Sequence, residues 1–265
     1  MVFKSDLPTP LKDYYYEIAA GGVPGVSVVH KFGAVIGITS SSVYKPVALG
    51  EDYNTPQVSG ATALRVKAGN TNDTAAGSGA QEVTLQGLDE TGALVEEALA
   101  TAGTSASSAT SATFIRLFRA WVSASGTYAS VTAGSHAADI VIENGSGGTD
   151  WITIDATGFP KGQSQVAIYT VPLGKRAFVS DYKLTTGGNK SVDFIFFQRQ
   201  NILETSAPYT AMRSILELTQ VDTEFSPKYG VPLGPFPALT DIGWMAKGAN
   251  TPDVTVDFEI ILEDT

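Results

Sequence analysis

The sequence predicts an all-β protein with two β-sandwich or jelly-roll-like domains behind an extended N-terminal arm. The chain has 265 residues, of which 43% are hydrophobic, so it can bury more than the single core of a typical domain. Val, Ile, Thr and Tyr dominate the apolar runs, and 27 Gly and 13 Pro residues separate these runs. Such a composition is typical of many short strands joined by turns. No long segment repeats its apolar residues with the period of a helix.

Residues 1–20 are predicted to form an arm outside the cores. Pro8 and Pro10 favour extended backbone, because proline fixes φ and restricts the residue before it. Three consecutive tyrosines follow, whose rings would alternate between the two sides of an extended chain. These candidate interface anchors are Tyr14, Tyr15 and Tyr16. The alternative is an ordinary first strand over Tyr14–Ile18, packed inside the domain.

A β-rich first domain is predicted over residues 21–143. It begins at the turn cluster Gly21–Gly25 and contains an Ala/Ser/Thr-rich connector before the strand Thr113–Ser123. Gly33 and Gly37 indicate a bend or a close backbone approach early in the domain. The run 26–39 is predicted to form a strand pair, and the further predicted strands are 42–49, 61–68, 81–88, 93–101, 113–123, 128–133 and 139–143.

A flexible linker is predicted at residues 144–150, because this segment is polar and rich in turn-forming residues. The second domain, residues 151–265, contains about eight strand-like runs, the number found in a jelly roll. Its last run alternates cleanly, with Val256, Phe258 and Ile260 on one face. The runs are 151–154, 165–171, 177–185, 192–199, 212–220, 223–226, 241–246 and 255–262.

Two of the predicted strands carry apolar residues on both faces. Val192–Arg199 contains three phenylalanines. In the strand 113–123, Arg116 falls on one face, whereas Arg119 and Trp121 fall on the other. Such strands are expected to be covered on both sides, and a neighbouring subunit is one source of that cover.

Charge and composition exclude several classes of function. The net charge of −10 argues against a protein that coats nucleic acid, which needs clustered Lys and Arg. The chain has no cysteine, and therefore no disulfide, no thiolate nucleophile and no Cys-based metal site. No apolar run approaches the roughly 20 residues of a membrane helix, and the N-terminal residues lack a signal-peptide pattern. We therefore expect synthesis and folding in a reducing cytoplasm, with neither nucleic acid nor membrane as a partner.

No catalytic constellation stands out, so the sequence predicts a protein that is not an enzyme and needs no cofactor. His30 and His136 lack triad neighbours, and no G-x-S-x-G motif is present. Paired carboxylates for glycoside hydrolysis are the formal alternative, but sequence alone does not set their separation. The pairs are Glu96 with Glu97, Asp150 with Asp155, and Asp253 with Asp257.

Two oxygen-rich loops are the alternatives to the prediction that the protein binds no metal. The first contains Asn70, Asn72 and Asp73; the second contains Glu143, Asn144 and Asp150. Calcium accepts such ligands, but neither loop has the spacing of an EF-hand. Asx residues also occupy loops because their side chains form turn hydrogen bonds.

Large aromatic and arginine side chains are the candidate interface residues, since such side chains are enriched in interface cores. Besides the three tyrosines of the arm, the candidates are Arg116, Arg119, Trp121 and Trp244. The alternative for each is the core of its own domain.

Two parts of the chain carry a family resemblance. In Asn70–Val122, an Asx-rich loop leads into two strands joined by the turn Asp89–Gly92, and a third strand follows the connector. The second part comprises the segments VAIYTVPLGKRAFV, VDFIFFQR and FPALTDIGWMAKGANTPDVTVDFEIILED. Together they cover well over half of the chain and resemble structural proteins of tailed-bacteriophage virions.

The resemblance implies a component of the virion exposed on the head or the tail. Among such components, the short chain favours a compact capsid decoration (cement) protein on the head exterior. Its expected partners are copies of itself, in a homo-oligomer such as a trimer, and the major capsid protein or other virion proteins. The absence of heptads and sequence repeats disfavours a long fibre. The alternative is a tail-associated or head-fibre protein that binds a host receptor or glycan.

Overall fold

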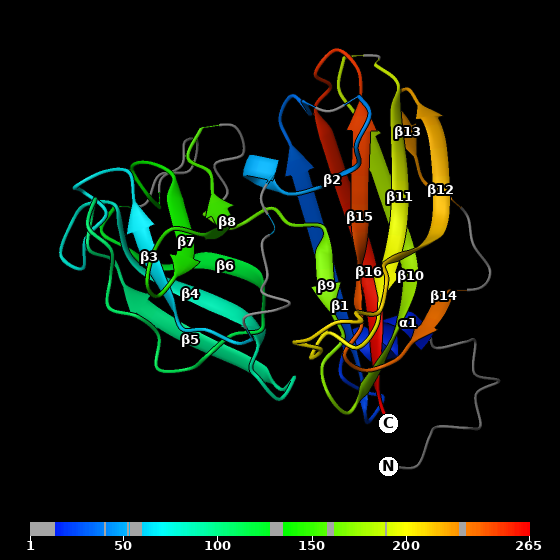
Figure 1. Cartoon of the computed structure of the whole chain (residues 1–265), viewed down its shortest axis with the longest axis horizontal. Coiled ribbons are helices and arrows are strands. Elements are labelled where there is room, and N and C mark those ends of the chain that lie inside the picture. The colour runs from blue at the N-terminus through cyan, green and yellow to red at the C-terminus, as the bar shows by residue number, and fades with distance from the viewer. Residues whose placement is uncertain are drawn as a thin grey trace, which may run out of the picture.

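The computed structural model describes residues 14–39, 41–51, 53, 60–127, 135–157, 162–188, 190–227 and 232–265. Within these residues the protein is all-β, as predicted, and its strands form four antiparallel sheets (Figure 1). Among the described residues, helical structure is limited to α1 (Tyr14–Ala19) and the 3-10 turn η1 (Leu49–Glu51). No helix in the described ranges has the length and apolar character needed to cross a membrane.

Two five-stranded sheets form the larger part of the molecule. The β16 sheet has the order β1-β16-β10-β13, with β14 also paired to β10. Its strands are β1 (Val26–Val35), β10 (Lys175–Thr186), β13 (Glu224–Phe225), β14 (Leu233–Phe236) and β16 (Val254–Asp264). The β11 sheet has the order β12-β11-β15-β2, with β9 also paired to β15. Its strands are β2 (Lys45–Pro46), β9 (Ile168–Thr170), β11 (Val192–Arg199), β12 (Arg213–Val221) and β15 (Asp241–Gly248).

A single aromatic-rich core joins these two sheets. The ring of Trp244 on β15 lies 4.8 Å from that of Tyr182 on β10 and 5.1 Å from that of Phe196 on β11. Phe258 of β16 also meets Phe196, edge to face. The alternation predicted for the last strand is confirmed, since Val256, Phe258 and Ile260 are all buried in this core.

Two three-stranded sheets form the smaller part of the molecule. The β7 sheet contains β3 (Leu64–Ala68), β7 (Ile140–Asn144) and β8 (Asp150–Ile154), with β7 in the centre. The β4 sheet contains β5 (Leu94–Ala100), β4 (Ala80–Leu88) and β6 (Arg116–Ser125), with β4 in the centre. A second core lies between these sheets and includes Val66, Leu85, Leu117, Ile142 and Trp151.

The strand pairing corrects the predicted domain boundaries. Residues 144–150 are not a linker: they form the turn of the β7–β8 hairpin, in which Glu143 pairs with Asp150. Gly147 and Gly148 have φ of 83° and 92°, and Gly-rich sequences suit such a turn as well as a linker. The division into 21–143 and 151–265 fails for the same reason. Instead, β1 and β2 pair with the C-terminal strands β16 and β15, and the strands β3–β8 are inserted between them.

The N-terminal prediction is corrected for its last residues. Tyr14–Ala19 form the helix α1, neither an extended arm nor a strand, and α1 packs on β1 with Ile18 buried. Two residues beyond the end of the helix, Gly21 has a φ of 70°, a left-handed conformation that glycine adopts without strain. Near this end, the backbone N–H of Gly22 donates to the carbonyl of Glu17 at 2.7 Å. Residues 1–13 lie outside the described residues, as does the strand predicted at 128–133.

The two strands with apolar residues on both faces are indeed covered on both sides, but by this chain itself. In β11, Phe194 and Phe196 face the larger core, whereas Phe197 packs in the smaller one. In β6, Phe118 packs in the larger core and Leu117 in the smaller. Burial of these strands therefore needs no neighbouring subunit.

Gly33 allows β1 to lie directly against the chain segments that enter and leave the inserted part. A Cβ atom at this position would overlap the backbone nitrogen of Ala167 and the backbone oxygen of Val47. Those two atoms are hydrogen bonded to each other at 2.8 Å, so neither can move freely. The predicted close backbone approach at Gly33 is confirmed.

We expect Gly33→Ala to lower the free energy of unfolding by about 1–3 kcal/mol, because the added methyl group forces the backbone apart in a packed region. Urea unfolding followed by tryptophan fluorescence measures the change. Ser27→Ala, an exposed position on the same strand, is the matched control and should change stability by less than about 0.5 kcal/mol. Equal midpoints for both variants would contradict the close approach.

Candidate functional site

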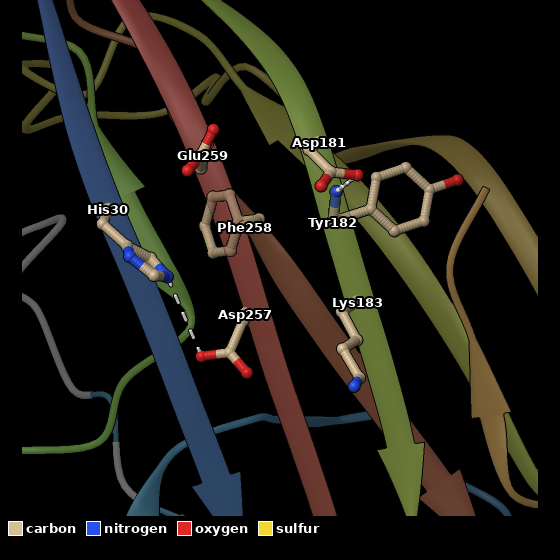
Figure 2. Close-up of a pocket in the computed structure, with 7 residues that line it drawn as sticks. All are labelled: His30, Asp181, Tyr182, Lys183, Asp257, Phe258 and Glu259. Atoms are coloured by element: carbon tan, nitrogen blue, oxygen red, sulfur yellow. Dashed lines mark hydrogen bonds and ion pairs between the residues drawn. The ribbon is translucent and has the colours of Figure 1, made fainter. Parts of the chain in front are cut away.

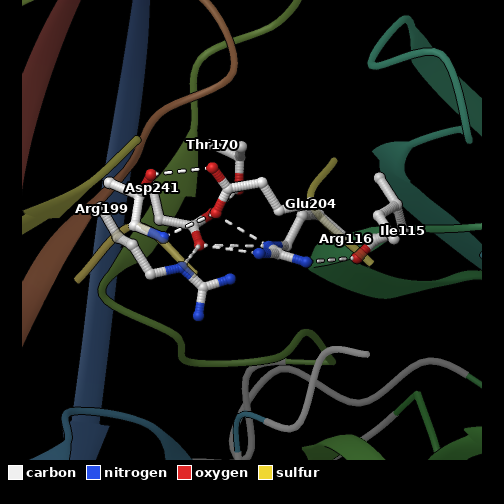
Figure 3. Close-up of polar contacts among 7 residues, drawn as sticks. Ile115, Arg116, Thr170, Arg199, Glu204 and Asp241 are labelled. Atoms are coloured by element: carbon white, nitrogen blue, oxygen red, sulfur yellow. Dashed lines mark hydrogen bonds and ion pairs between the residues drawn. The ribbon is translucent and has the colours of Figure 1, made fainter. Parts of the chain in front are cut away.

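The best-defined polar site is a buried ion pair between the inserted part and the larger sheets. Arg116 is the first residue of β6, and Asp241 is the first residue of β15. Arg116 Nε lies 3.0 Å from Asp241 Oδ1, and Nη2 lies 3.0 Å from Oδ2 (Figure 3). The guanidinium is fully buried and the carboxylate is nearly so. This two-point geometry is the strongest form of an arginine–carboxylate contact.

The remaining hydrogen-bonding capacity of the pair is also used. Arg116 Nη1 donates to the carbonyl of Ile115 at 2.8 Å, and Thr170 Oγ1 of β9 donates to Asp241 Oδ1 at 2.7 Å. Arg199 of β11 approaches the other carboxylate oxygen, with Nε at 3.8 Å from Oδ2. Strands from both parts of the molecule therefore converge on one carboxylate.

Burial and charge act in opposite directions on the two arginines. Burial lowers the pKa of Arg116, but the Asp241 carboxylate and its hydrogen bonds more than offset this, so that the pKa of Arg116 is raised overall. Burial lowers the pKa of Arg199, which Asp241 offsets only in part. Arg116 is therefore a permanent cation with a matched anion, and the cluster holds strands in place rather than exchanging protons.

A second polar contact lies at the same junction. Lys31 of β1 is 5% exposed, and its Nζ donates to the carbonyl of Phe118 on β6 at 2.6 Å. Nζ also lies 5.7 Å from the centre of the Phe118 ring. Burial, with a smaller contribution from the charge of Arg119, lowers the pKa of Lys31 from 10.5 to about 7. A buried ammonium without a carboxylate partner is costly, so its charge at neutral pH depends on small changes in conditions.

A shallow polar pocket of about 160 Å³ lies on the outer face of the β16 sheet (Figure 2). Its side chains come from three adjacent strands: His30 from β1, Asp257 and Glu259 from β16, and Asp181 and Lys183 from β10. The His30 Nε2 atom lies 3.9 Å from Asp257 Oδ1, and both side chains are more than half exposed. The pocket offers hydrogen-bond donors and acceptors on a wet, open surface.

Two of the predicted interface residues lie in the interior of the molecule instead. Arg116 belongs to the ion pair above, and Trp244 is 0% exposed at the centre of the larger core. Arg119 and Trp121 are partly buried at the junction: the Arg119 guanidinium lies 5.6 Å from the Trp121 ring and 5.7 Å from the Phe32 ring. Of the three tyrosines in α1, the side chain of Tyr16 is 69% exposed.

Both oxygen-rich loops have structural roles in the described structure. The Asp73 carboxylate is fully buried and accepts hydrogen bonds from the backbone N–H groups of Ala80, Ala137 and Ala138. Glu143 pairs with Arg65, with Oε1 2.8 Å from Nε. Within the described ranges, no three His, Asp or Glu side chains gather in a way that could hold a metal ion.

One histidine and two of the nominated carboxylates are likewise held by local contacts. His136 is buried, with Nε2 3.1 Å from the carbonyl oxygen of Asp155. Glu97 accepts hydrogen bonds from the backbone N–H groups of Ser111 and Ala112 at 2.7 and 2.8 Å. Asp253 accepts one from the N–H of Gly37 at 2.8 Å. These groups close loops.

Asp241 and Lys31 were missed in the sequence. The available signal was a lone charge in an apolar strand, since Lys31 lies within VSVVHKFGAV and Asp241 precedes IGWMA. A buried charge needs a partner, but the spacing along the chain does not reveal which one.

Comparisons with known proteins identify no family. No protein-family model matches the chain, and no curated protein matches it. A solved structure, the infectious bursal disease virus VP2 subviral particle, is 9% identical over 83% of this chain and 79% of that chain, with a TM-score of 0.17. That score is too low to establish a shared fold, so the likeness carries no argument.

We expect Asp241→Asn to lower the free energy of unfolding by about 3–5 kcal/mol, because the buried Arg116 guanidinium loses the negative charge of the carboxylate that contacts it at two points. Denaturant unfolding measures the loss. Replacing both charges, in Arg116→Met with Asp241→Leu, should cost less than the single change. Glu224→Gln, which breaks the exposed pair with Lys183, is the control and should cost less than about 1 kcal/mol. A loss at Asp241 no larger than this control would contradict the role of the pair.

Lys31 should make stability depend on pH. Between the folded pKa of about 7 and the unfolded value of 10.5, the unfolded chain binds more protons, so stability should rise as pH increases through this window. Below pH 7 the Lys31 amine is protonated in both the folded and the unfolded chain, and burial of its charge then lowers the free energy of unfolding by its full amount. We expect the stability of the wild type relative to Lys31→Met to rise by a few kcal/mol from pH 7 to pH 10. Lys183→Met, at an exposed site, is the control. Parallel stability curves for wild type and Lys31→Met would contradict the assignment.

Proposed function

We propose that this chain is a structural protein of a bacteriophage virion, most specifically an oligomeric capsid decoration protein on the head exterior, without enzymatic activity. The virion assignment rests on the sequence resemblance of Asn70–Val122 and of the C-terminal segments. The structural observation that supports a mechanical role is the junction built around Arg116 and Asp241. It ties the inserted part to the β11 sheet, and the neighbouring contact of Lys31 with Phe118 ties it to the β16 sheet, so a force applied to one part passes to the other.

We also propose that the larger and the smaller part of the molecule are two β-sandwiches. The two larger sheets with their common core fit the two-layer packing of a β-sandwich, and the two smaller sheets fit a second one. In this proposal the second sandwich is an insertion in the first. The pair of layers would present two separate surfaces, one for the capsid and one for a neighbouring subunit.

A decoration protein acts by adding contact area across the boundaries between capsid subunits. Each bound copy raises the work needed to separate them when packaged DNA presses outward. Attachment through several sites of one oligomer strengthens weak single contacts without new chemistry. The net charge of −10 favours an exterior position, since an acidic protein is repelled by packaged DNA.

The second candidate is a tail-associated or head-fibre protein that binds a host glycan. The pocket on the β16 sheet favours it, because His30, Asp257 and Lys183 present exposed polar groups side by side on adjacent strands (Figure 2). Sugar hydroxyls both donate and accept hydrogen bonds, which such a mixed set of side chains can satisfy.

The experiment that separates these proposals localises the protein on intact particles. Purified virions would be labelled with an antibody to the full chain and imaged by electron microscopy, with mass spectrometry of the same particles. We expect label distributed over the head. Label confined to the tail or to fibres would replace the decoration role with the second candidate, and absence of the chain from virions would overturn both.

A further inference from the structure

Strand β12 leaves a long backbone edge open at the end of the β11 sheet. It pairs with β11 on one side and has no described strand on the other (Figure 1). It is nine residues long, whereas β2 and β13, two of the other strands that end the two larger sheets, have two residues each. The ten-residue β1 also ends a sheet, but it contacts η1 and β9. An open strand of this length is a template for another strand.

The open edge of β12 carries exposed side chains of both charges together with exposed apolar side chains. Arg213, Ile215 and Glu217 are exposed, and Ile215 is 40% accessible. Met212, just before the strand, is 47% accessible. Arg213 forms no ion pair with any other described residue. The edge therefore displays one cation, one anion and two apolar side chains in alternation.

We propose that β12 pairs antiparallel with β12 of a second copy of this chain, about a two-fold axis at Ile215. In this register Arg213 lies opposite Glu217 of the partner subunit, and the symmetry repeats that pair. Met212 then lies opposite Leu218 of the partner subunit, and the two copies of Ile215 meet at the axis. Cross-strand pairs of opposite charge and of apolar residues are those that stabilise antiparallel sheets.

The arrangement of charges favours a second copy as the occupant. A two-fold interface needs a surface that is complementary to itself, and one cation and one anion placed symmetrically about Ile215 satisfy that requirement. The exposed edge strand β5 does not, because its charged side chains are the two acids Glu96 and Glu97. Since each copy carries a net charge of −10, a local attraction is needed for two copies to approach.

Two features of β12 bear on the strength of this contact. Tyr44 Oη lies 3.3 Å from Glu217 Oε1, which leaves Oε2 for the guanidinium of the partner subunit. The register of β12 with β11 shifts near Ile215 and again near Gln220, and such bulges limit the length over which strands pair. We therefore expect a reversible dimer whose population rises with concentration. This inference rests on the oligomer in the proposed function and names its surface.

Charge reversal tests the register. Arg213→Glu places acid opposite acid, and Glu217→Arg places base opposite base, so each should raise the dissociation constant of the dimer about tenfold or more. The double variant restores opposite charges and should return the dissociation constant to that of the wild type. A mixture of the two single variants should form a heterodimer, since one variant carries acidic side chains at both positions and the other carries basic side chains at both. Sedimentation velocity over a micromolar-to-millimolar concentration series measures the dissociation constants of the two single variants, the double variant and the mixture.

Glu90→Arg is the matched control for Glu217→Arg, because it makes the same change in net charge at an exposed turn outside β12 and should leave the dimer unchanged. Thermal melts of each variant check folding. A wild-type monomer throughout the series, a trimer, or a dimer insensitive to both single reversals would overturn the pairing. The proposed function has a separate readout: a chain that decorates heads but stays monomeric would retain the virion role and lose this interface.

Discussion

The buried pair of Arg116 and Asp241 sets a constraint that the surrounding structure has to meet. A guanidinium removed from water loses its hydration, and only a carboxylate at hydrogen-bonding distance, with further partners for the remaining atoms, offsets that cost. Ion pairs of this kind add little net stability compared with apolar residues of the same volume. Their effect is on arrangement, because a shift of β6 relative to β15 would break the two-point contact between Arg116 and Asp241.

The neighbouring polar contacts follow from this constraint. With β6 fixed at Arg116, the carbonyl of Phe118 falls within reach of Lys31 on β1, and Arg119 reaches the ring of Phe32 on the same strand. The inserted part is thus attached to both larger sheets, to one through an ion pair and to the other through a buried amine. Apolar packing supplies the bulk of the contact, since Leu88 and Ile115 enter the larger core.

Local patterns in the sequence were enough to place most strands, since the two-residue alternation of a half-buried strand needs no knowledge of its partner. The same local patterns did not predict which strands pair with which. Val26 pairs with Glu263 near the other end of the chain, and nothing in either segment specifies that choice. Turn chemistry was equally ambiguous at 144–150, where glycines that suit a linker also suit a hairpin.

The candidate site shows the same limit. Arg116 was recognisable as an unusual residue in an apolar strand, but a subunit interface and an internal ion pair both explain such a residue. Its partner Asp241 lies 125 residues away. A lone charge in an apolar strand indicates that a partner exists, whereas only the fold brings the two together. The helix at Tyr14 was missed because six residues are too few to show a helical period.

The pairing of β1 with β16 also determines the order in which the chain can fold during synthesis. Ribosomes add about 5–20 residues per second, so β1 waits on the order of ten seconds or more for the strand that completes its sheet. The strands β3–β8, by contrast, find all their sheet partners among themselves, and their sheets can close as soon as they emerge. The smaller part would then be folded while the apolar face of β1 is still exposed. During that interval the nascent chain has the greatest need of a chaperone that covers this face.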